Sequence, residues 1–227
     1  MFHIGPISIN LKIEGLVSYN SLSEERWLKL TCSAEGKEVE PFKKMNIAVT
    51  QRLSIRRLES QDRQYFAELF TDPRVLEGIP QNPFNENQIE ERFSKSLRLE
   101  LVDLYEENGT AGIYEKGKSE LIGLALFLRN EANEMELGYR FRFGYWGKGY
   151  GTEITQAMLE FYFNTLKALK VTADVNLANH ASVRILDKYM TPVKEFFNER
   201  DQCTDRRYEL KKRQWLETSH SVSLGKI

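Results

Sequence analysis

Residues 136–152, with the sequence ELGYRFRFGYWGKGYGT, constrain the fold of this chain more than any other stretch. A strand pattern leads into a glycine-rich turn, and the pattern of an amphipathic helix follows directly. Gly147, Gly149 and Gly151 allow the backbone to turn tightly and to bring its N–H groups close to a ligand. The N-terminus of the following helix favours an anion at the same place, usually a phosphate. The stretch therefore predicts a phosphate-binding turn between a strand and a helix.

Two well-known phosphate-binding loops do not fit this turn. A P-loop requires a serine or threonine directly after its lysine, and here Gly149 follows Lys148. The dinucleotide-binding fingerprint requires a third glycine, and Ile154 occupies that position. The turn therefore belongs to another class of phosphate site, or is an ordinary tight connection between a strand and a helix.

The string YWGKGYGTE at residues 145–153 resembles the acyl-CoA pyrophosphate loop of the GCN5-related N-acetyltransferases, the GNAT family. Trp146 stands at the first loop position, where an aromatic residue is common in the RimJ/RimL type of ribosomal-protein N-terminal acetyltransferases. A second stretch, Asn179 to Ser182, resembles the family pattern N-x-x-S. The helix after it departs from the family ending E-K-L-G-F, because residues 187–191 read DKYMT and lack the glycine that usually caps the helix.

Hydrophobic periodicity predicts the elements around these motifs. Ser60 is expected to cap a helix that Asp72 and Pro73 end, and Ile89, Phe93 and Leu97 mark a second, amphipathic helix. A further helix is expected at residues 152–166 and another after Asn179. Strands are expected at residues 53–57, 111–115, 121–128, 134–143, 169–175, 192–197 and 206–215.

The order of these elements predicts an α/β (α+β) fold. Three consecutive strands with short turns indicate an antiparallel meander, and the strand–helix–strand unit at residues 134–175 places its two strands parallel. The resemblance implies the GNAT fold, a mixed, mostly antiparallel sheet with flanking helices. It also implies that the two parallel strands splay apart and receive the pantetheine arm of the cofactor.

We predict three parts in the chain. Residues 1–44 form an N-terminal extension of unknown role, too short to bury a core of its own. We expect it to pack on the main domain, to pair with a second copy of the chain or to be held only loosely. Residues 45–217 form the N-acetyltransferase domain, and residues 218–227 form a polar tail.

Composition excludes several other classes of protein. A formal net charge of -1 gives no basic footprint for nucleic acid. No apolar run reaches the ~18 residues of a membrane span, and the N-terminus does not resemble a signal peptide. Cys32 and Cys203 are far apart and suit thiols in a reducing cytoplasm, and the three histidines form no metal-ligand cluster. We expect a cytoplasmic monomer or homodimer without a metal.

The resemblance implies acetyl-CoA as the cosubstrate and assigns residues to it. The N–H groups of Leu137 and Gly138 are expected to face the thioester carbonyl. Asn179 is expected to hydrogen-bond the pantetheine or its thiol end, to cap its helix, or both. The pyrophosphate is expected on the backbone of the loop residues Trp146, Gly147, Lys148, Gly149, Tyr150, Gly151 and Thr152.

The catalytic candidates are Glu136 and Ser182. A carboxylate in a cleft is suited to take a proton from the amine. The alternative for Glu136 is a strand glutamate that faces solvent or pairs with an arginine, and Glu134 is the reserve candidate. Ser182 is the candidate acid for the leaving thiolate. Many relatives use a tyrosine seven residues after the asparagine, where this chain has Leu186, and Tyr189 is out of register.

These features predict an acetyl-CoA-dependent N-acetyltransferase that acts on a primary amine. By resemblance, the leading acceptor is a protein N-terminus such as that of a ribosomal protein. An amino acid, a polyamine or an aminoglycoside remains an alternative acceptor, because one scaffold serves many substrates. A non-catalytic acyl-CoA-binding domain is the other alternative, and Glu136 discriminates between it and the enzyme.

Overall fold

The computed structural model describes residues 46–77, 79, 81–100, 103–106, 108–199 and 201–217. All of them belong to Lys44–Ile227, the second of the two units into which the chain divides. The predicted N-terminal extension, Cys32 and the predicted polar tail lie outside the described residues.

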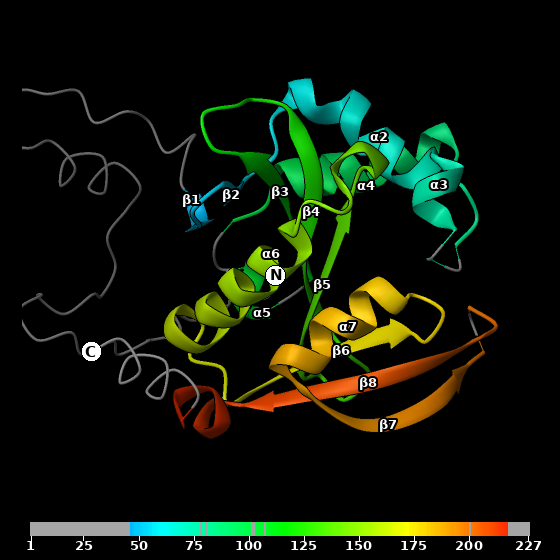
Figure 1. Cartoon of the computed structure of the whole chain (residues 1–227). Helices are drawn as coiled ribbons and strands as arrows, with labels where there is room; N and C mark the ends of the chain where they lie inside the picture. The colour runs from blue at the N-terminus through cyan, green and yellow to red at the C-terminus, as the bar shows by residue number, and fades with distance from the viewer. Residues whose placement is uncertain are drawn as a thin grey trace, which may run out of the picture. The chain divides into compact units, whose positions relative to one another are not determined.

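The described residues contain one sheet of eight strands in the order β1-β2-β3-β4-β5-β6-β8-β7 (Figure 1). Neighbouring strands pair antiparallel throughout, except for β5 and β6, which are parallel. This arrangement confirms the predicted mixed, mostly antiparallel sheet. The strands are β1 (Asn46–Val49), β2 (Leu53–Arg56), β3 (Gly109–Glu115), β4 (Leu121–Arg129), β5 (Met135–Phe141), β6 (Lys170–Asn176), β7 (Thr191–Asn198) and β8 (Cys203–Lys211).

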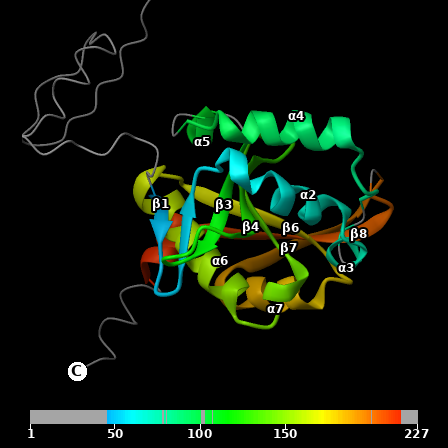
Figure 2. The same cartoon turned by 90° about the horizontal axis from the view of Figure 1, so that it is seen from above.

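Helices cover both faces of the sheet, with α2 and α4 on one face and α6 and α7 on the other (Figure 2). The helices are α2 (Arg63–Thr71), α3 (Pro73–Leu76), α4 (Glu86–Leu97), α5 (Asp103–Glu106), α6 (Tyr150–Glu160) and α7 (His180–Tyr189). Short 3-10 turns lie at Ser60–Asp62 and Phe143–Tyr145, and a π-turn at Phe161–Thr165 continues α6. Each face of the sheet therefore has its own apolar core.

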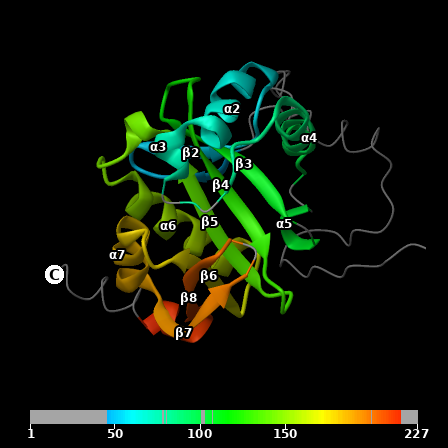
Figure 3. The same ribbon diagram turned by 90° about the vertical axis from the view of Figure 1, so that its right-hand side faces the viewer.

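The alternation of β5 directs its side chains to the two faces of the sheet. Leu137 and Phe141 are buried against Ile154 and Met158 of α6, as the period-two pattern of a strand requires. The other core is built from α2, α4 and the strands β3 and β4. Figure 3 shows β5 between β4 and β6 in the middle of the sheet. The side chains of β5 that alternate with Leu137 therefore face α2 and α4.

Two predictions about element ends were wrong. Ser60 is not the N-cap, because Glu59 takes that position and its N–H donates to Asp62 Oδ2 (2.7 Å) in a capping box. The last strand does not extend to residue 215, because β8 ends at Lys211 and residues 212–217 are helical. The ring of Trp215 stacks on Phe163 at 5.4 Å from inside this helical turn.

The missing glycine at the end of α7 has a simple structural solution. Met190 takes an extended conformation (φ -132°, ψ 161°) directly after the helix, and β7 begins at Thr191. The helix thus ends by a change to extended backbone, without the positive φ that a glycine cap provides. The path into the last two strands is therefore kept.

Three further observations concern the described residues only. None of their helices is long and apolar enough to cross a membrane. No group of three or more His, Cys, Asp or Glu side chains among them is placed to hold a metal ion. The thiol of Cys203 donates a hydrogen bond to Asp205 Oδ1 (3.3 Å).

Candidate active site

The strands β5 and β6 are paired at a single register position, Glu136 with Thr172. Each strand is paired along its full length with its other neighbour, β4 or β8. Beyond Glu136 the two strands therefore diverge, and the edges that face each other lose their strand partners. Strand N–H and C=O groups left in this way need other hydrogen-bond partners. The structure thus contains the splayed pair that the sequence predicted.

A cavity of about 760 Å³ occupies the opening between the diverging strands. Predicted site residues from β5 and from the start of α7 line it: Glu136, Leu137, Gly138, Asn179 and Ser182. The loop residues 146–152 lie outside this cavity. Gly149 and Thr152 instead line a second cavity of about 670 Å³, between α6 and the β1–β2 hairpin. The predicted site is therefore divided between the strand opening and the end of α6.

The glycine loop has the conformation that the sequence predicted. Gly147 and Gly149 have positive φ values of 72° and 76°, which side chains with a Cβ rarely adopt. Gly149 is the N-cap of α6, so the first N–H groups of the helix have no intrahelical acceptor. Within the described residues, no backbone acceptor is found for the N–H groups of residues 147–152. The loop and the helix end therefore present N–H groups that an anion can accept from.

Gly151 is explained by a close contact rather than by its φ angle. A Cβ at this position would lie 2.9 Å from Cδ1 of Ile185 on α7 and 3.3 Å from the hydroxyl of Tyr139. The glycine lets α6, α7 and β5 approach each other at the end of the cavity. It thus brings the loop next to the cavity, because Tyr139 also lines the strand opening.

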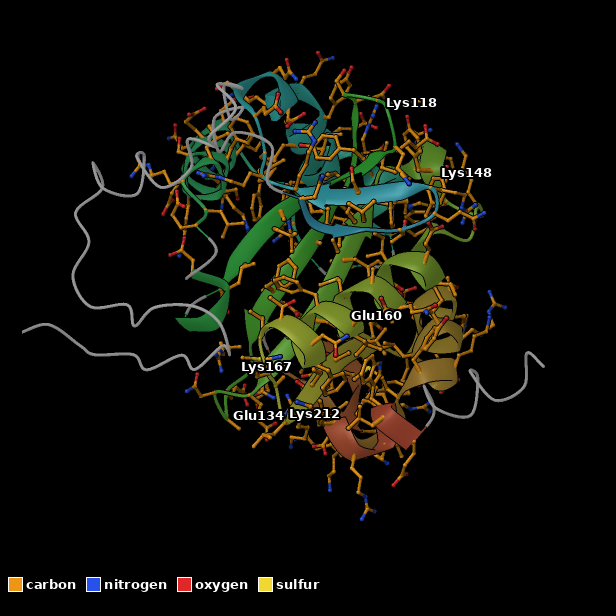
Figure 4. The ribbon with its side chains drawn as sticks, turned by 90° about the vertical axis from the view of Figure 1, so that its left-hand side faces the viewer. Lys118, Glu134, Lys148, Glu160, Lys167 and Lys212 are labelled. Atoms are coloured by element: carbon orange, nitrogen blue, oxygen red, sulfur yellow. The ribbon has the colours of Figure 1, made fainter. Side chains whose placement is uncertain are left out.

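The side chains of the loop hold its shape. The indole Nε1 of Trp146 donates to the carbonyl oxygen of Phe141 (2.9 Å), and the ring is 46% exposed. The ammonium of Lys148 lies 4.5 Å from the ring centroid of Tyr145. Figure 4 shows Lys148 on the surface, with Glu134 at the opposite end of the domain. The hydroxyl of Tyr150 donates to Glu115 and fixes the first residue of α6.

An arginine outside the predicted site anchors the loop. Arg52, between β1 and β2, donates through Nη1 to the carbonyl oxygen of Lys148 (2.9 Å) and through Nε to Glu153 Oε2 (2.7 Å). The backbone N–H of Arg52 also donates to Glu153 Oε1 (2.8 Å). The hydroxyl of Thr50 donates to the same carboxylate, and these bonds lower the pKa of Glu153 although burial raises it. Sequence reasoning missed both Arg52 and Glu153.

Glu136 lies where the opening begins. Its carbonyl oxygen accepts a hydrogen bond from the hydroxyl of Tyr162 (2.8 Å), which fixes the backbone at this point. Its half-buried side chain lines the cavity. Nearby, Arg207 forms a two-pronged ion pair with Asp174 (2.5 and 2.7 Å). The hydrogen bonds to Asp174 are the main reason why the pKa of Arg207 is raised, and the charge of Glu136 adds to the increase. Glu136 is therefore in the electrostatic reach of a cation.

The reserve candidate Glu134 is held differently. Its carboxylate lies 2.6 Å from the ammonium of Lys170 and accepts from Asn130 Nδ2 (3.0 Å). The contact with Lys170 is the main reason why the pKa of Glu134 is lowered. Glu134 precedes β5 and does not line the cavity. A carboxylate held in this way is a weak proton acceptor. Glu136 lines the cavity and stays the first candidate base.

Asn179 and Ser182 are joined by the helix cap. Asn179 Oδ1 accepts from the backbone N–H of Ser182 (3.1 Å), so the asparagine is the N-cap of α7. Leu186, where relatives have a tyrosine, is 3% exposed within the apolar core. Tyr189 packs against the edge of the same core, and burial raises its pKa.

Tyr139 is the third residue that sequence reasoning missed. Its hydroxyl is buried and has no hydrogen-bond partner within the described residues. Burial raises its pKa, and the hydroxyl groups of Ser182 and Thr155 lie close enough to lower it, although neither has the geometry of a hydrogen bond to it. The sequence offers one signal. Tyr139 lies two residues after Leu137 on β5, so the alternation of the strand puts its ring on the same face, towards α6. The structure therefore shows an unpaired donor between the cavity and the glycine loop.

Comparison with known proteins adds independent findings. The profile of the acetyltransferase (GNAT) domain matches residues 52–189, which include β5, the glycine loop and α7. An uncharacterized N-acetyltransferase, p20 of Bacillus licheniformis, is 25% identical over 145 residues, which are 63% of this chain and 80% of that protein.

Two solved structures share the fold at lower sequence identity. One is RimL, a ribosomal L7/L12 alpha-N-protein acetyltransferase in complex with coenzyme A, with a TM-score of 0.60 and 15% identity over 74% of this chain and 98% of that one. The other is a spermidine N-acetyltransferase from Vibrio cholerae in complex with CoA and spermine, with a TM-score of 0.60 and 18% identity over 72% of this chain and 98% of that one.

Proposed function

This chain belongs to the GNAT family of acetyltransferases, and we propose that it transfers the acetyl group of acetyl-CoA to a primary amine. We propose a protein N-terminal α-amine of the ribosomal-protein type as the leading acceptor, since one structural neighbour is such an enzyme. The observation that carries the proposal is the opening between β5 and β6. It begins at the single Glu136–Thr172 pair and holds candidate residues for both catalysis and cofactor binding.

The residues present fit an acyl-CoA molecule in three respects. The loop at residues 146–152 and the N-terminus of α6 offer N–H groups for a diphosphate. The diverging edges of β5 and β6 have backbone groups that the amides of a pantetheine arm can pair with. The buried hydroxyl of Tyr139 lies between these two regions and lacks a partner. One extended ligand with phosphates and amides would satisfy all three.

Acetyl-CoA supplies the acetyl group as a thioester when it is bound. The chain has to take a proton from the amine, polarise the carbonyl and give a proton to the thiolate. We assign the first task to Glu136, directly or through a water molecule. The N–H groups of Leu137 and Gly138, at the start of the opening, serve the second task as hydrogen-bond donors. Ser182, across the cavity on α7, serves the third.

The remaining predicted residues hold the cosubstrate. Because Asn179 Oδ1 is used by the helix cap, we propose that its Nδ2 donates to the pantetheine. Lys148 contributes mainly its backbone N–H, since its ammonium lies over the ring of Tyr145. Tyr139 is positioned to donate to the pantetheine arm or to Ser182.

Two alternative functions remain, and a specific observation favours the first. The fold is shared with a spermidine N-acetyltransferase, so a small amine is a second candidate acceptor. A non-catalytic acyl-CoA-binding domain would keep the loop and have no use for Glu136. We place the protein in the cytoplasm, in keeping with the thiol of Cys203.

Calorimetry of the purified protein tests the proposal. We expect micromolar binding of acetyl-CoA and CoA and no binding of ATP, followed by acetylation of N-terminal peptides in an acceptor screen. Failure of a well-folded protein to bind acetyl-CoA would overturn the proposed reaction. Binding without turnover on peptides, amino acids, polyamines or aminoglycosides would favour the non-catalytic alternative.

A further inference from the structure

Arg140 is a half-buried cation whose only hydrogen-bond acceptors in the described residues are neutral. It lies on β5 four residues after Glu136, on the face that packs against α2. Its Nη1 donates to the carbonyl oxygen of Leu69 (2.9 Å), and its Nη2 donates to Gln81 Oε1 (3.1 Å). The guanidinium also lies 4.6 Å from the ring centroid of Phe70. These contacts hold the side chain in place, but none of them carries a negative charge.

A second arginine adds to the positive charge. The guanidinium of Arg92, from α4, lies 5.5 Å from the ring centroid of Phe70 and 5.8 Å from that of Phe84. Burial, with a smaller contribution from the charge of Arg92, lowers the pKa of Arg140 to about 10. Arg92 is exposed, and partial removal of its guanidinium from water lowers its pKa. Within the described residues, no carboxylate forms an ion pair with either arginine.

The neighbouring arginine shows that the fold does pair such side chains. Arg142, two residues later, forms ion pairs with Glu68 (2.8 Å) and with Glu120. A guanidinium that is partly removed from water is costly unless it is paired with an anion, and a neutral donor could make the same two hydrogen bonds of Arg140 without that cost. The charge of Arg140 is therefore unexplained by the protein itself.

The phosphates of the proposed cosubstrate are not placed to neutralise this charge. They are expected at the glycine loop and the N-terminus of α6, whereas Arg140 contacts Leu69 and Phe70 of α2 on the opposite face of the sheet. Arg140 does line the cavity that also holds Glu136 and Gly138. The missing anion is therefore expected on the acceptor side of the site.

We propose that Arg140, supported by Arg92, binds a carboxylate of the acceptor, so that the substrate is an amine that also carries an acidic group. This inference rests on the proposed acetyl transfer and gives its substrate class. A polyamine has no acidic group that could pair with Arg140, so it would leave this charge uncompensated. Gly138 lies between Glu136 and Arg140 on the same face and leaves room for an extended substrate.

The spacing indicates how far apart the two groups of the substrate are. The Cα atoms of Glu136 and Arg140 are separated by four strand residues, roughly 13 Å. The two side chains shorten this span, but the amine and the carboxylate must still lie several ångströms apart. A peptide N-terminus with an acidic side chain at the second or third residue meets this requirement. A free amino acid with a distal amine, such as lysine, is the small-molecule source of the same chemistry.

Matched acceptors test the proposal in the unmodified protein. Two hexapeptides that differ only by Asp or Asn at the second and third residues isolate the carboxylate, and lysine against lysinamide does the same for a small molecule. We expect kcat/KM to be about 10- to 100-fold higher for the acid in one of these pairs, the range of a charge-assisted hydrogen bond. The pair that responds identifies the source. Equal rates within both pairs, or spermidine as the best acceptor, would overturn the inference.

Variants assign the effect to the arginines. In Arg140→Gln, kcat/KM for the acid is expected to be close to that for the matching amide. Arg140→Lys keeps a positive charge and is expected to retain part of the preference for the acid. Arg213→Gln is the matched control, because Arg213 is 88% exposed and pairs with Glu217. If Arg140→Gln does not fold, Arg92→Gln, at a more exposed position, is expected to lower the ratio about three- to tenfold. An unchanged ratio in a folded Arg140→Gln variant would contradict the assignment.

Calorimetry with acetyl-CoA distinguishes failure of the carboxylate site from failure of the proposed reaction. A variant or wild-type protein that binds acetyl-CoA but does not discriminate the acid from the amide would refute only the carboxylate site. A wild-type protein that binds no acetyl-CoA would refute the proposed reaction, and this inference with it.

Discussion

The guanidinium of Arg52 lies 2.7 Å from the carboxylate of Glu153, a residue 101 positions later in the sequence. The same guanidinium donates to the carbonyl oxygen of Lys148 (2.9 Å) and lies 4.7 Å from the ring centroid of Tyr150. One arginine thus ties the β1–β2 hairpin to the glycine loop and to the first turn of α6. It also offsets the negative charge of Glu153, which would repel a phosphate bound at this helix end.

Arg52→Gln is expected to weaken acetyl-CoA binding about tenfold, because the loop loses its anchor and the charge of Glu153 is no longer offset. The free energy of unfolding should fall by no more than about 1 kcal/mol, because the side chain of Arg52 is 46% exposed. Calorimetry and urea denaturation measure the two effects. Equal affinity in wild type and variant would show that the anchor does not act on the ligand, and Arg213→Gln is the control.

Gly149→Ala is expected to lower both stability and acetyl-CoA affinity. Its φ of 76° is strained for alanine by about 1–2 kcal/mol, and the strain falls on the loop that is proposed to hold the diphosphate. Gly117 provides a matched control, since its φ is 77° and it lies in the turn between β3 and β4. Gly117→Ala should cost similar stability in urea denaturation and leave acetyl-CoA affinity unchanged. A similar loss of affinity in both variants would argue against a specific role of the loop.

The sequence was sufficient for the features that depend on local patterns. The positive φ of Gly147 and Gly149 follows from glycine spacing, and the N-cap of α7 follows from Asn179. The parallel arrangement of β5 and β6 follows from the crossover helix between them. Each of these depends on residues close together in the sequence, where backbone sterics and short hydrogen bonds decide the structure.

The residues that were missed depend on contacts between distant parts of the chain. The pairing of Arg52 with Glu153 has no local signal, because either residue could equally face solvent. The burial of the Tyr139 hydroxyl depends on how closely α6 and α7 approach β5, which Gly151 permits. Trp215 fits a strand pattern as well as a helix, and only its contact with Phe163 distinguishes the two.

Glu136→Gln is expected to lower kcat about 10²- to 10⁴-fold, the usual contribution of a general base, and to leave acetyl-CoA affinity unchanged. The pH dependence of kcat/KM should lose its acidic limb. Glu134→Gln is the comparison, because its carboxylate is paired with Lys170 outside the cavity. Steady-state kinetics across pH on both variants measures the effects. A wild-type rate and pH profile in Glu136→Gln would remove this residue as the base.

Tyr139→Phe is expected to act in opposite directions on the free and the bound protein. A buried hydroxyl without a partner costs about 1–3 kcal/mol, so its removal should raise the melting temperature of the free protein by about 2–4 °C or more. If the hydroxyl donates to the pantetheine arm, acetyl-CoA affinity should fall about three- to tenfold. Thermal unfolding with and without acetyl-CoA measures both effects. A lower melting temperature without ligand would show that Tyr139 already has a partner.

Ser182→Ala is expected to lower kcat and to leave the KM for acetyl-CoA nearly unchanged, because its backbone N–H still bonds Asn179. The effect should be modest, about tenfold, since a thiolate is a fair leaving group near neutral pH. Stopped-flow detection of the released thiol checks this step directly. An unaltered turnover would reduce Ser182 to a packing role.

The ion pair of Glu134 with Lys170 should make stability depend on acidic pH. The ammonium of Lys170 lowers the pKa of Glu134 below its ordinary value of 4.5, so the folded state binds the proton less readily than the unfolded state. This contribution is fully present above about pH 5 and is lost as the pH falls through the folded-state pKa. Urea denaturation should show Glu134→Gln to be about 0.5–1 kcal/mol less stable than wild type at pH 7, with the two curves converging near pH 3. Glu86→Gln is the control, because Glu86 is 78% exposed in its pair with Arg63 and should cost little at either pH. A difference for Glu134→Gln that persists at pH 3 would mean that packing, not charge, is the source of its effect.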